Sequence, residues 1–144
     1  MTCFQQMSCF QYCEMIPQIQ HHQELVRLFV LHFHDDHVTL ARVDVTLTPE
    51  TISQATGIPN IGEEWNKGQQ LDRSYYEPYI RPSYLRQLRR VFPFQFLKEY
   101  YTPLMRLIIR YFSGEGRFSR LYAYHIRLLM HFTRVKFMNI PYFM

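Results

Sequence analysis

Histidines and aspartates are concentrated in one short segment, whose side chains are the most metal-like group in the sequence. His32, His34 and His37 fall within six positions and enclose Asp35 and Asp36. Imidazole and carboxylate groups suit zinc or a non-haem metal. No second ligand motif such as H-E-x-x-H accompanies them. A solvated loop between a helix and a strand explains the segment better, and we predict that the three imidazoles do not converge on one metal ion.

The three cysteines lie together near the start of the chain, at Cys3, Cys9 and Cys13. An odd number argues against a disulfide framework. Cys9 and Cys13 match only a C-x₃-C spacing, and the adjacent pair His21 and His22 is poorly placed to complete a zinc site. We therefore expect free thiols on an amphipathic N-terminal segment, with no metal.

The sequence lacks the known motifs for a catalytic nucleophile and for phosphate binding. It contains no G-x-S-x-G, P-loop or G-x-G-x-x-G pattern, and Gly114-Glu115-Gly116 lacks the third glycine. The second half of the chain has three carboxylates, none of them paired. We predict that the protein is not an enzyme, with no catalytic residues and no cofactor.

Arginines recur at helical spacing in the second half of the chain. Four of them fall near one line on the last predicted helix: Arg117, Arg120, Arg127 and Arg134. On the preceding predicted helix, Arg106 and Arg110 form an i, i+4 pair. Three more arginines cluster before that helix: Arg86, Arg89 and Arg90. Arginine with interleaved aromatic rings is suited to contacting phosphates and unpaired bases. The other interpretation is a solvated helix face whose arginine stems cover apolar surface. In either case, we expect the first four to form an exposed ridge beside buried Leu121, Tyr124, Leu128 and Phe132.

The net charge of +4 hides a marked asymmetry between the two halves. Residues 1–72 carry 3 basic and 9 acidic side chains, whereas residues 73–144 carry 13 basic and 3 acidic ones. Such a distribution indicates either an anionic partner for the second half or docking of the acidic half on the basic one.

Length and composition indicate one folded domain. The chain has 144 residues, of which 47% are hydrophobic and 19% charged, and this excludes a disordered chain. No apolar run approaches the roughly 20 residues that span a bilayer, and no secretory signal is visible. We expect an intracellular protein without a membrane partner, and the sequence does not separate nucleus from cytoplasm.

The predicted fold is mainly α with a small β-hairpin, an α+β arrangement. Residues 1–16 form an atypical segment rich in cysteine and aromatic residues, and residues 17–144 form a single helical domain. We expect helices over 17–33, 49–56, 84–91, 95–101, 104–112 and 118–132, a hairpin near 38–47 that bends at Ala41-Arg42, and a long loop over 57–82. Strand-like alternation is an alternative for part of 17–33. The apolar end, Pro141 to Met144, predicts a fragment of a longer domain.

The helix that follows the hairpin has clear boundary signals. Thr48 is suited to cap its N-terminus, Pro49 to be its first residue, and Glu50 to lie in its positively polarised first turn. Gly57 is expected to end it in the left-handed conformation. Trp65, the only tryptophan, is then expected to fold back against this helix or the hairpin.

A stretch around this helix resembles a family of plant retrotransposon-derived proteins. The resemblance covers about residues 25–144, and its most distinctive positions are Thr48, Pro49, Gly57, Ile58, Pro59, Asn60, Gly62 and Trp65. It implies a non-enzymatic module encoded beside a mobile element, and no catalytic residues come with it. The first 16 residues depart from the family pattern.

Two functions are compatible with these observations. The first is a mobile-element-derived protein–protein interaction or assembly module, which binds a protein partner or self-associates through its aromatic-rich helices. The alternative is a nucleic-acid-binding module that contacts RNA or DNA through the arginine-rich helices of residues 83–136.

Overall fold

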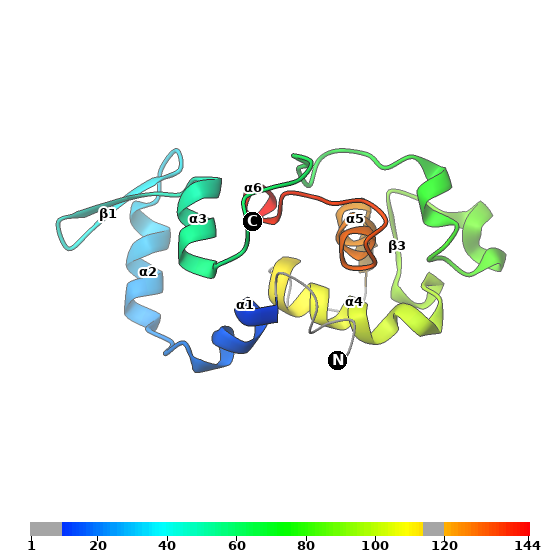
Figure 1. The fold of residues 1–144 in the computed structure, drawn as a ribbon, viewed down its shortest axis with the longest axis horizontal. Coiled ribbons are helices and arrows are strands. Elements are labelled where there is room, and N and C mark those ends of the chain that lie inside the picture. Colours follow the sequence, from blue (N-terminus) through cyan, green and yellow to red (C-terminus); the bar gives the residue numbers. More distant parts are fainter. Residues whose placement is uncertain (1–9, 114–119) are drawn as a thin grey trace. The chain divides into compact units, whose positions relative to one another are not determined.

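The computed structural model describes residues 10–113 and 120–144. These residues are mainly helical and include two small antiparallel two-stranded sheets, which confirms the predicted α+β class (Figure 1). They group into two units: unit 1 runs up to Asn60 and includes Ile140–Tyr142, and unit 2 comprises Ile61–Asn139 with Phe143 and Met144. The range expected to form a single domain, 17–144, is thus divided between residues 60 and 61.

The first helical part of unit 1 is interrupted. α1 (Phe10–Met15) continues into a 3-10 turn, η2 (Ile16–Gln18), and α2 spans Gln23–His32. Ile19 and His22 both adopt extended backbone conformations. The helix expected over 17–33 is therefore shortened to α2, and the alternative strand over this range is wrong.

A hairpin follows α2, as predicted. β1 (His37–Leu40) pairs antiparallel with β2 (Val43–Thr46). The two turn residues, Ala41 and Arg42, have φ values of 49° and 68°, and positive φ at both central residues is typical of a type I′ turn. The turn matches the right-handed twist of the strands, so the bend is confirmed.

A second tight turn lies immediately before β1. Asp35 and Asp36 have φ values of 48° and 67°. The flanking His34 and His37 exchange two backbone hydrogen bonds, of 2.8 and 3.0 Å. Aspartate tolerates the left-handed region better than most residues, which explains why this acidic pair occupies the turn.

Helix α3 (Pro49–Thr56) begins and ends as its sequence predicts. The Thr48 hydroxyl accepts a hydrogen bond from the Thr51 amide at 3.2 Å, and the Thr51 hydroxyl accepts one from the Thr48 amide at 2.8 Å. Gly57 ends the helix with φ 73°. Both the N-cap and the left-handed C-cap are therefore confirmed.

Unit 2 contains fewer long helices than predicted. Its elements, in chain order, are the 3-10 turns η3 (Arg73–Tyr76) and η4 (Pro82–Gln87), strand β3 (Val91–Pro93), the 3-10 turns η5 (Phe94–Phe96) and η6 (Glu99–Tyr101), α4 (Thr102–Ile108), a π-helical turn η7 (Ile109–Ser113), strand β4 (Arg120–Tyr122) and α5 (Ala123–Phe132). The short α6 (Ile140–Phe143) is the last helix, and its residues Ile140–Tyr142 belong to unit 1.

Three of the predicted helices of unit 2 need correction. The ranges 84–91 and 95–101 contain only 3-10 turns and the first residue of strand β3. Pro82 precedes the first range and Pro93 separates the two, and proline interrupts a continuous helix. In addition, β3 pairs with β4 in a sheet. The range 118–132 begins with β4 where it is described, and α5 starts only at Ala123. The helix expected over 104–112 is confirmed by α4 and η7.

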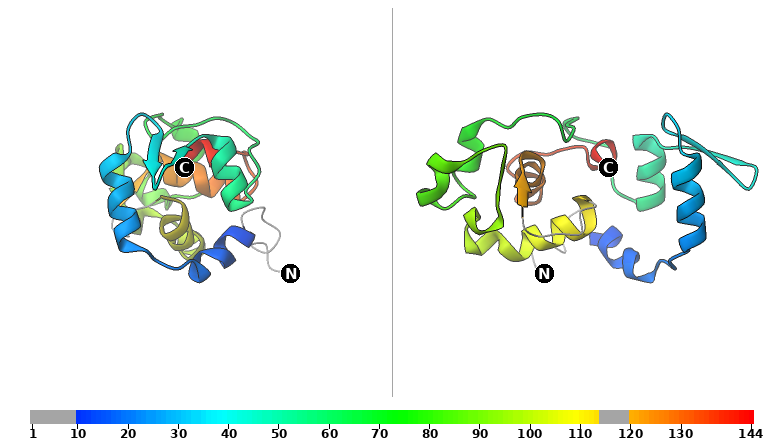
Figure 2. Two further views of the ribbon diagram at one scale, coloured as in Figure 1. Left: turned by 90° about the vertical axis from the view of Figure 1, so that its left-hand side faces the viewer. Right: turned by 180° about the vertical axis from the view of Figure 1, so that it is seen from behind.

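Helix α5 is the centre of unit 2. Every residue from Tyr124 to Met130 is buried, and so is Phe132. α4 packs against it, and the two helices lie next to each other in Figures 1 and 2. The expected burial of Leu121, Tyr124, Leu128 and Phe132 is confirmed. Trp65 is buried too and belongs to unit 2, whereas the helix and hairpin it was expected to contact belong to unit 1.

Candidate functional site

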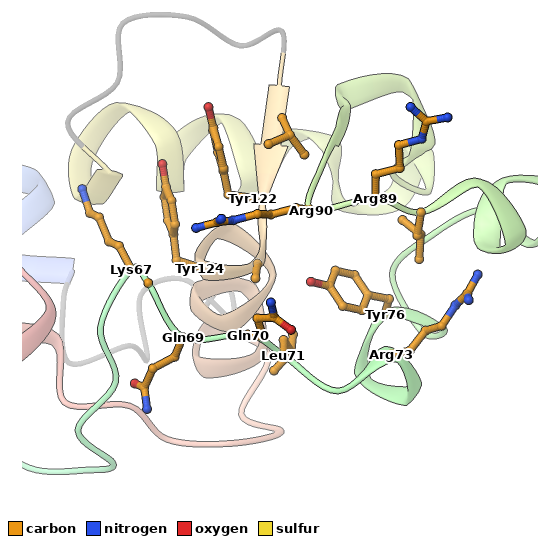
Figure 3. Close-up of a pocket in the computed structure, with 14 residues that line it drawn as sticks. Lys67, Gln69, Gln70, Leu71, Arg73, Tyr76, Arg89, Arg90, Tyr122 and Tyr124 are labelled. Atoms are coloured by element: carbon orange, nitrogen blue, oxygen red, sulfur yellow. The ribbon is translucent and has the colours of Figure 1, made fainter.

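A cavity of about 670 Å³ opens in unit 2 where three separate segments meet (Figure 3). The loop and 3-10 turn of 67–76, the segment 88–91 that leads into β3, and residues 122–124 at the start of α5 all contribute. Its lining combines basic, amide and aromatic side chains with a few apolar ones: Lys67, Gly68, Gln69, Gln70, Leu71, Arg73, Tyr76, Leu88, Arg89, Arg90, Val91, Tyr122, Ala123 and Tyr124.

Hydrogen bonds from side chains to the backbone fix the conformation of the segment 67–76. The Asn66 side-chain oxygen accepts a hydrogen bond from the Gly68 amide at 2.9 Å, and the Gln69 side-chain oxygen accepts one from the Asn66 amide at 2.8 Å. Asp72 then caps η3 by accepting hydrogen bonds from the amide and the hydroxyl of Ser74. These turns present Lys67 at one end of the cavity and Arg73 at the other (Figure 3).

The other two segments are brought together by the strand pair. Val91 faces Tyr122 in the antiparallel register of β3 and β4. Residues just before Val91 therefore lie opposite residues just after Tyr122. This places Arg90 beside Tyr122 and Tyr124, although they are more than thirty positions apart in the sequence, whereas the Arg89 side chain lies farther from the two rings (Figure 3).

Two tyrosines form a stacked pair on the cavity wall. The ring centroids of Tyr122 and Tyr124 are 5.3 Å apart and their planes differ by 8°. Lys67 Nζ lies 5.2 Å from the Tyr124 centroid and donates a hydrogen bond to the Ser113 carbonyl at 3.1 Å. The Arg90 side chain extends toward the tyrosine pair (Figure 3). Cations and π-faces are thus adjacent at this wall.

All the described charged side chains that line the cavity are positive. Four cationic side chains line it, namely Lys67, Arg73, Arg89 and Arg90, and all four are exposed. Within residues 10–113 and 120–144, no carboxylate lines the cavity and none forms a salt bridge with these four. Positive charge beside aromatic rings can attract an anionic, ring-containing ligand.

A second hollow adjoins the first. It has a volume of about 520 Å³ and shares Leu88, Arg89 and Val91 with the cavity. Arg86 and Phe96 are among its other lining residues. Phe96 stacks on Tyr84 with ring centroids 4.2 Å apart and planes 3° apart. Basic and aromatic groups therefore continue past Arg89 on the far side of the same segment.

The arginine ridge expected on the last helix is wrong. Arg120 is exposed but lies in β4, and Arg134 is exposed but follows α5, with φ 60°. Arg127, between them, is only 1% exposed. A continuous helix would have aligned all three, but the change from strand to helix at Ala123 breaks the periodicity. Arg117 lies outside the described residues.

The other arginine pair singled out from the sequence does not reach the cavity. Arg106 and Arg110 are exposed on α4 and η7, and neither is among the lining residues. Arg110 lies over the neighbouring Tyr111 ring at 5.5 Å. Sequence reasoning noted Arg89 and Arg90 as a cluster but missed Lys67, Arg73 and Tyr76, for which the length of the 57–82 loop was the only signal.

Arg127 is neutralised by a carboxylate instead of facing solvent. Its Nη2 donates to Glu63 Oε2 at 2.5 Å, and Lys136 Nζ lies 3.0 Å from the same oxygen. Desolvation raises the pKa of Glu63, but the hydrogen bonds and charges of Lys136 and Arg127 outweigh it, so that the net pKa is lowered. This ion-pair cluster lies outside the cavity, and among the described residues it forms no salt bridge with the four cations of the cavity lining.

The residues of the family-like motif fall in both units. In unit 1, the Ser53 hydroxyl donates to the Ile58 carbonyl at 2.6 Å and the Asn60 amide donates to Glu50 at 3.1 Å, which holds the turn after α3. In unit 2, Gly62 has φ 112° and lies against the Met138 backbone. These positions have structural roles, and none lines the cavity.

Metal ligation receives no support from the described part of the chain. Among those residues, no group of three or more His, Cys, Asp or Glu side chains is placed to hold a metal ion. His34 pairs instead with its neighbour Asp35 at 3.1 Å. Cys13 is buried, and burial raises the pKa of its thiol to about 11, which keeps it protonated. Cys3 and Cys9 lie outside the described residues.

Comparison of the chain with protein-family models, with curated proteins and with solved structures finds no match. Within the described residues, no helix has the length and apolar character needed to cross a bilayer.

Proposed function

We propose that unit 2 binds nucleic acid at the basic cavity. The observation that carries this proposal is the lining itself: Lys67 and Arg90 lie beside the Tyr122–Tyr124 pair, and Arg73 and Arg89 line the other end of the same cavity (Figure 3). No carboxylate is among the described lining residues. Phosphate contacts by arginine and lysine supply most of the affinity in such complexes, and rings supply stacking surfaces. The interface lies at a different place from the helical ridge that the arginine spacing indicates.

The overall charge favours the same partner. Unit 1, up to Asn60, carries six acidic and two basic residues, whereas the remainder of the chain carries six acidic and fourteen basic ones. Of the acidic residues in unit 2, Glu63 is occupied by Arg127 and Lys136. A positively charged unit attracts polyanions at long range and accelerates their association.

A salt series with two matched double variants tests the proposal. Four cations that neutralise phosphates give a slope of about −3 for log affinity against log salt on a single strand. Arg89→Gln with Arg90→Gln is expected to weaken binding and to flatten this slope by about 1.4. Arg106→Gln with Arg110→Gln removes the same charge outside the cavity and is expected to leave both nearly unchanged.

The result would contradict the proposal in either of two cases. One is that the parent protein binds neither RNA nor DNA at low salt. The other is that the α4 variant loses affinity as strongly as the cavity variant does, since the net charge alone would then explain binding.

Protein assembly is a second candidate function, which a separate observation in unit 1 favours. Val26 and Val30 of α2 and its C-cap residue Phe33 follow one another at helical spacing and are 50%, 70% and 40% exposed. Next to them, a hollow of about 350 Å³ is lined by Ile19 and Leu25, among others. An exposed apolar stripe of this kind is typical of a protein contact. We propose that two copies of the chain pack α2 against α2.

Sedimentation velocity across a concentration series tests this second candidate. Val30→Glu is expected to shift the distribution toward monomer, because it places a charge at the centre of an apolar contact. Gln54→Glu, on the exposed surface of α3, adds the same charge elsewhere and serves as control. A parent protein that stays monomeric at every concentration would remove this candidate.

The mobile-element origin remains a proposal that rests on the residue pattern around α3. Either function is compatible with a non-enzymatic module encoded beside a retrotransposon. The residues of that pattern cap α3, hold the turn after it or allow a close backbone approach.

A further inference from the structure

We infer, on the basis of the proposed function, that the ligand is a single strand and that one of its unpaired bases stacks on Tyr122. The cavity offers a partly exposed tyrosine ring, cations along its lining, and a continuation into a second hollow. Each of these features favours a flexible strand over a duplex.

Tyr122 is the ring available for stacking. It is partly exposed, and one of its faces is covered by the parallel ring of Tyr124. Tyr124 is itself buried and held by His125 at 4.2 Å and by Phe143 at 5.9 Å. Tyr124 therefore acts as a positioning residue that fixes Tyr122, and the exposed part of the Tyr122 ring is where a base would stack. An ordered platform loses little entropy when a base is added to it.

The cations lie where the backbone of a stacked nucleotide would pass. Lys67 borders the Tyr124 side of the pair, and Arg90 extends toward both rings (Figure 3). In a duplex the bases are stacked on one another and paired, so none reaches a protein ring without being unpaired at a cost of a few kcal/mol. A single strand presents its bases freely. The recessed position of the tyrosines thus selects against a duplex.

The ligand extends over more than one nucleotide. Arg89 lines both hollows, and Arg86 continues the positive charge into the second one. A strand that enters beside Lys67 and passes Arg89 reaches Arg86 while remaining in contact with cations. Single-strand-binding OB folds, which have a different architecture, cover about 4–16 nucleotides each. We therefore expect an oligonucleotide to bind more tightly than a mononucleotide.

The experiment compares three probes: an oligodeoxyadenylate and an oligoriboadenylate of about twelve nucleotides, and a DNA duplex of about twelve base pairs. Fluorescence anisotropy at a fixed low salt is expected to rank both single strands above the duplex. Tyr122→Leu is expected to weaken single-strand binding by about 5- to 100-fold, and Tyr122→Phe to retain it, because stacking needs the ring and not the hydroxyl. Tyr100→Leu is the matched control, since Tyr100 is 86% exposed and outside the cavity.

A second measurement does not depend on the folding of any variant. A 2-aminopurine base within the single strand is expected to lose fluorescence when it stacks on a tyrosine of the parent protein. If the duplex binds as tightly as the single strands, or if Tyr122→Leu binds normally and 2-aminopurine is not quenched, the stacking inference is overturned. The proposed function survives that result as long as Arg89→Gln with Arg90→Gln still flattens the salt dependence.

Discussion

Arg127 and Glu63 are 64 positions apart, and they form an ion pair of 2.5 Å in which the arginine is almost fully buried. The pair fixes the loop after residue 60 to helix α5. Backbone hydrogen bonds reinforce this link, because the Asn139 amide donates to the Glu63 carbonyl at 2.8 Å and the Glu63 amide to the Phe137 carbonyl at 3.2 Å. Among the described residues, Arg127 Nε and Nη1 have no hydrogen-bond partner. The arginine thus depends heavily on its one carboxylate.

Glu63→Gln is expected to destabilise unit 2 by about 2 kcal/mol. The substitution leaves the buried guanidinium of Arg127 without its counter-charge. Breaking a fully buried ion pair costs about 3–5 kcal/mol. Because the Glu63 side chain is 42% exposed, solvent reduces this cost. Urea unfolding of the variant measures the change. Glu64→Gln, at the neighbouring exposed position, serves as control and is expected to change the free energy of unfolding little. Equal stability of the two variants would contradict the prediction.

The stability of unit 2 is expected to fall as the pH drops from about 6.5 toward 4. Burial lowers the pKa of both His125 and His131 to about 4, with the charges of Lys67 and Arg127 contributing respectively. Below pH 6.5 the unfolded chain binds protons that the folded chain does not, so that each histidine reduces the free energy of unfolding by up to about 1.4 kcal/mol per pH unit. The lowered pKa of Glu63 acts in the same direction at lower pH.

Denaturant unfolding at several pH values measures this dependence. His125→Gln is expected to make it shallower, because the glutamine does not titrate and its oxygen can still accept the hydrogen bond that the Tyr122 amide donates to His125 Nδ1 at 3.0 Å. His32→Gln, at the exposed end of α2, should leave the dependence unchanged. A stability that stays constant from neutral pH to pH 4 would be incompatible with buried neutral histidines.

Local signals in the sequence identified the parts of the fold that depend on neighbouring residues. The N-cap at Thr48, the left-handed Gly57 and the bend at Ala41-Arg42 each follow from a few adjacent side chains. Long-range pairing escaped the same reasoning. Strand β4 forms because Arg120–Tyr122 pairs with Val91–Pro93, and no local pattern reveals that partner. Once β4 takes the place of part of the first predicted helical turn, the spacing that aligned the arginines no longer applies.

The candidate site was only partly predictable for the same reason. The arginine cluster that includes Arg89 and Arg90 is visible in the sequence, and so are the tyrosines at 122 and 124. Their meeting requires the strand pair, and Lys67 and Tyr76 join them from a loop without periodicity. Three segments far apart in the chain form one cavity, which spacing rules within a single helix cannot indicate.

Suitable substitutions in the hairpin turn between β1 and β2 are expected to stabilise unit 1. Ala41 and Arg42 both have positive φ, and left-handed conformations cost ordinary residues about 1–2 kcal/mol. Ala41→Asn with Arg42→Gly supplies the preferred type I′ residues and should stabilise unit 1 by about 1 kcal/mol. Ala41→Val, which adds a β-branched side chain, should destabilise it. Thermal unfolding followed by circular dichroism measures both, and a double variant with a lower melting temperature would contradict the prediction.

Gly57 and Gly62 both have positive φ, but they differ in what surrounds them. At Gly57, with φ 73°, an added Cβ would meet nothing within 4 Å. Gly57→Ala therefore has only a backbone cost, of about 1 kcal/mol. At Gly62, with φ 112°, an added Cβ would lie 2.8 Å from the Met138 carbonyl carbon and 2.9 Å from the Asn139 nitrogen. Those atoms belong to backbone and cannot move aside as a side chain would.

We therefore expect Gly62→Ala to cost about 2–4 kcal/mol, clearly more than Gly57→Ala, because strain and overpacking add. The clash would also separate Glu63 from residues 137–139 and so weaken the hydrogen bonds between these segments. Hydrogen exchange of the Asn139 amide, which donates to Glu63, should accelerate in Gly62→Ala and stay slow in Gly57→Ala. If the two variants unfold at the same denaturant concentration, the close approach at Gly62 does not limit this position, and its glycine is needed for φ alone.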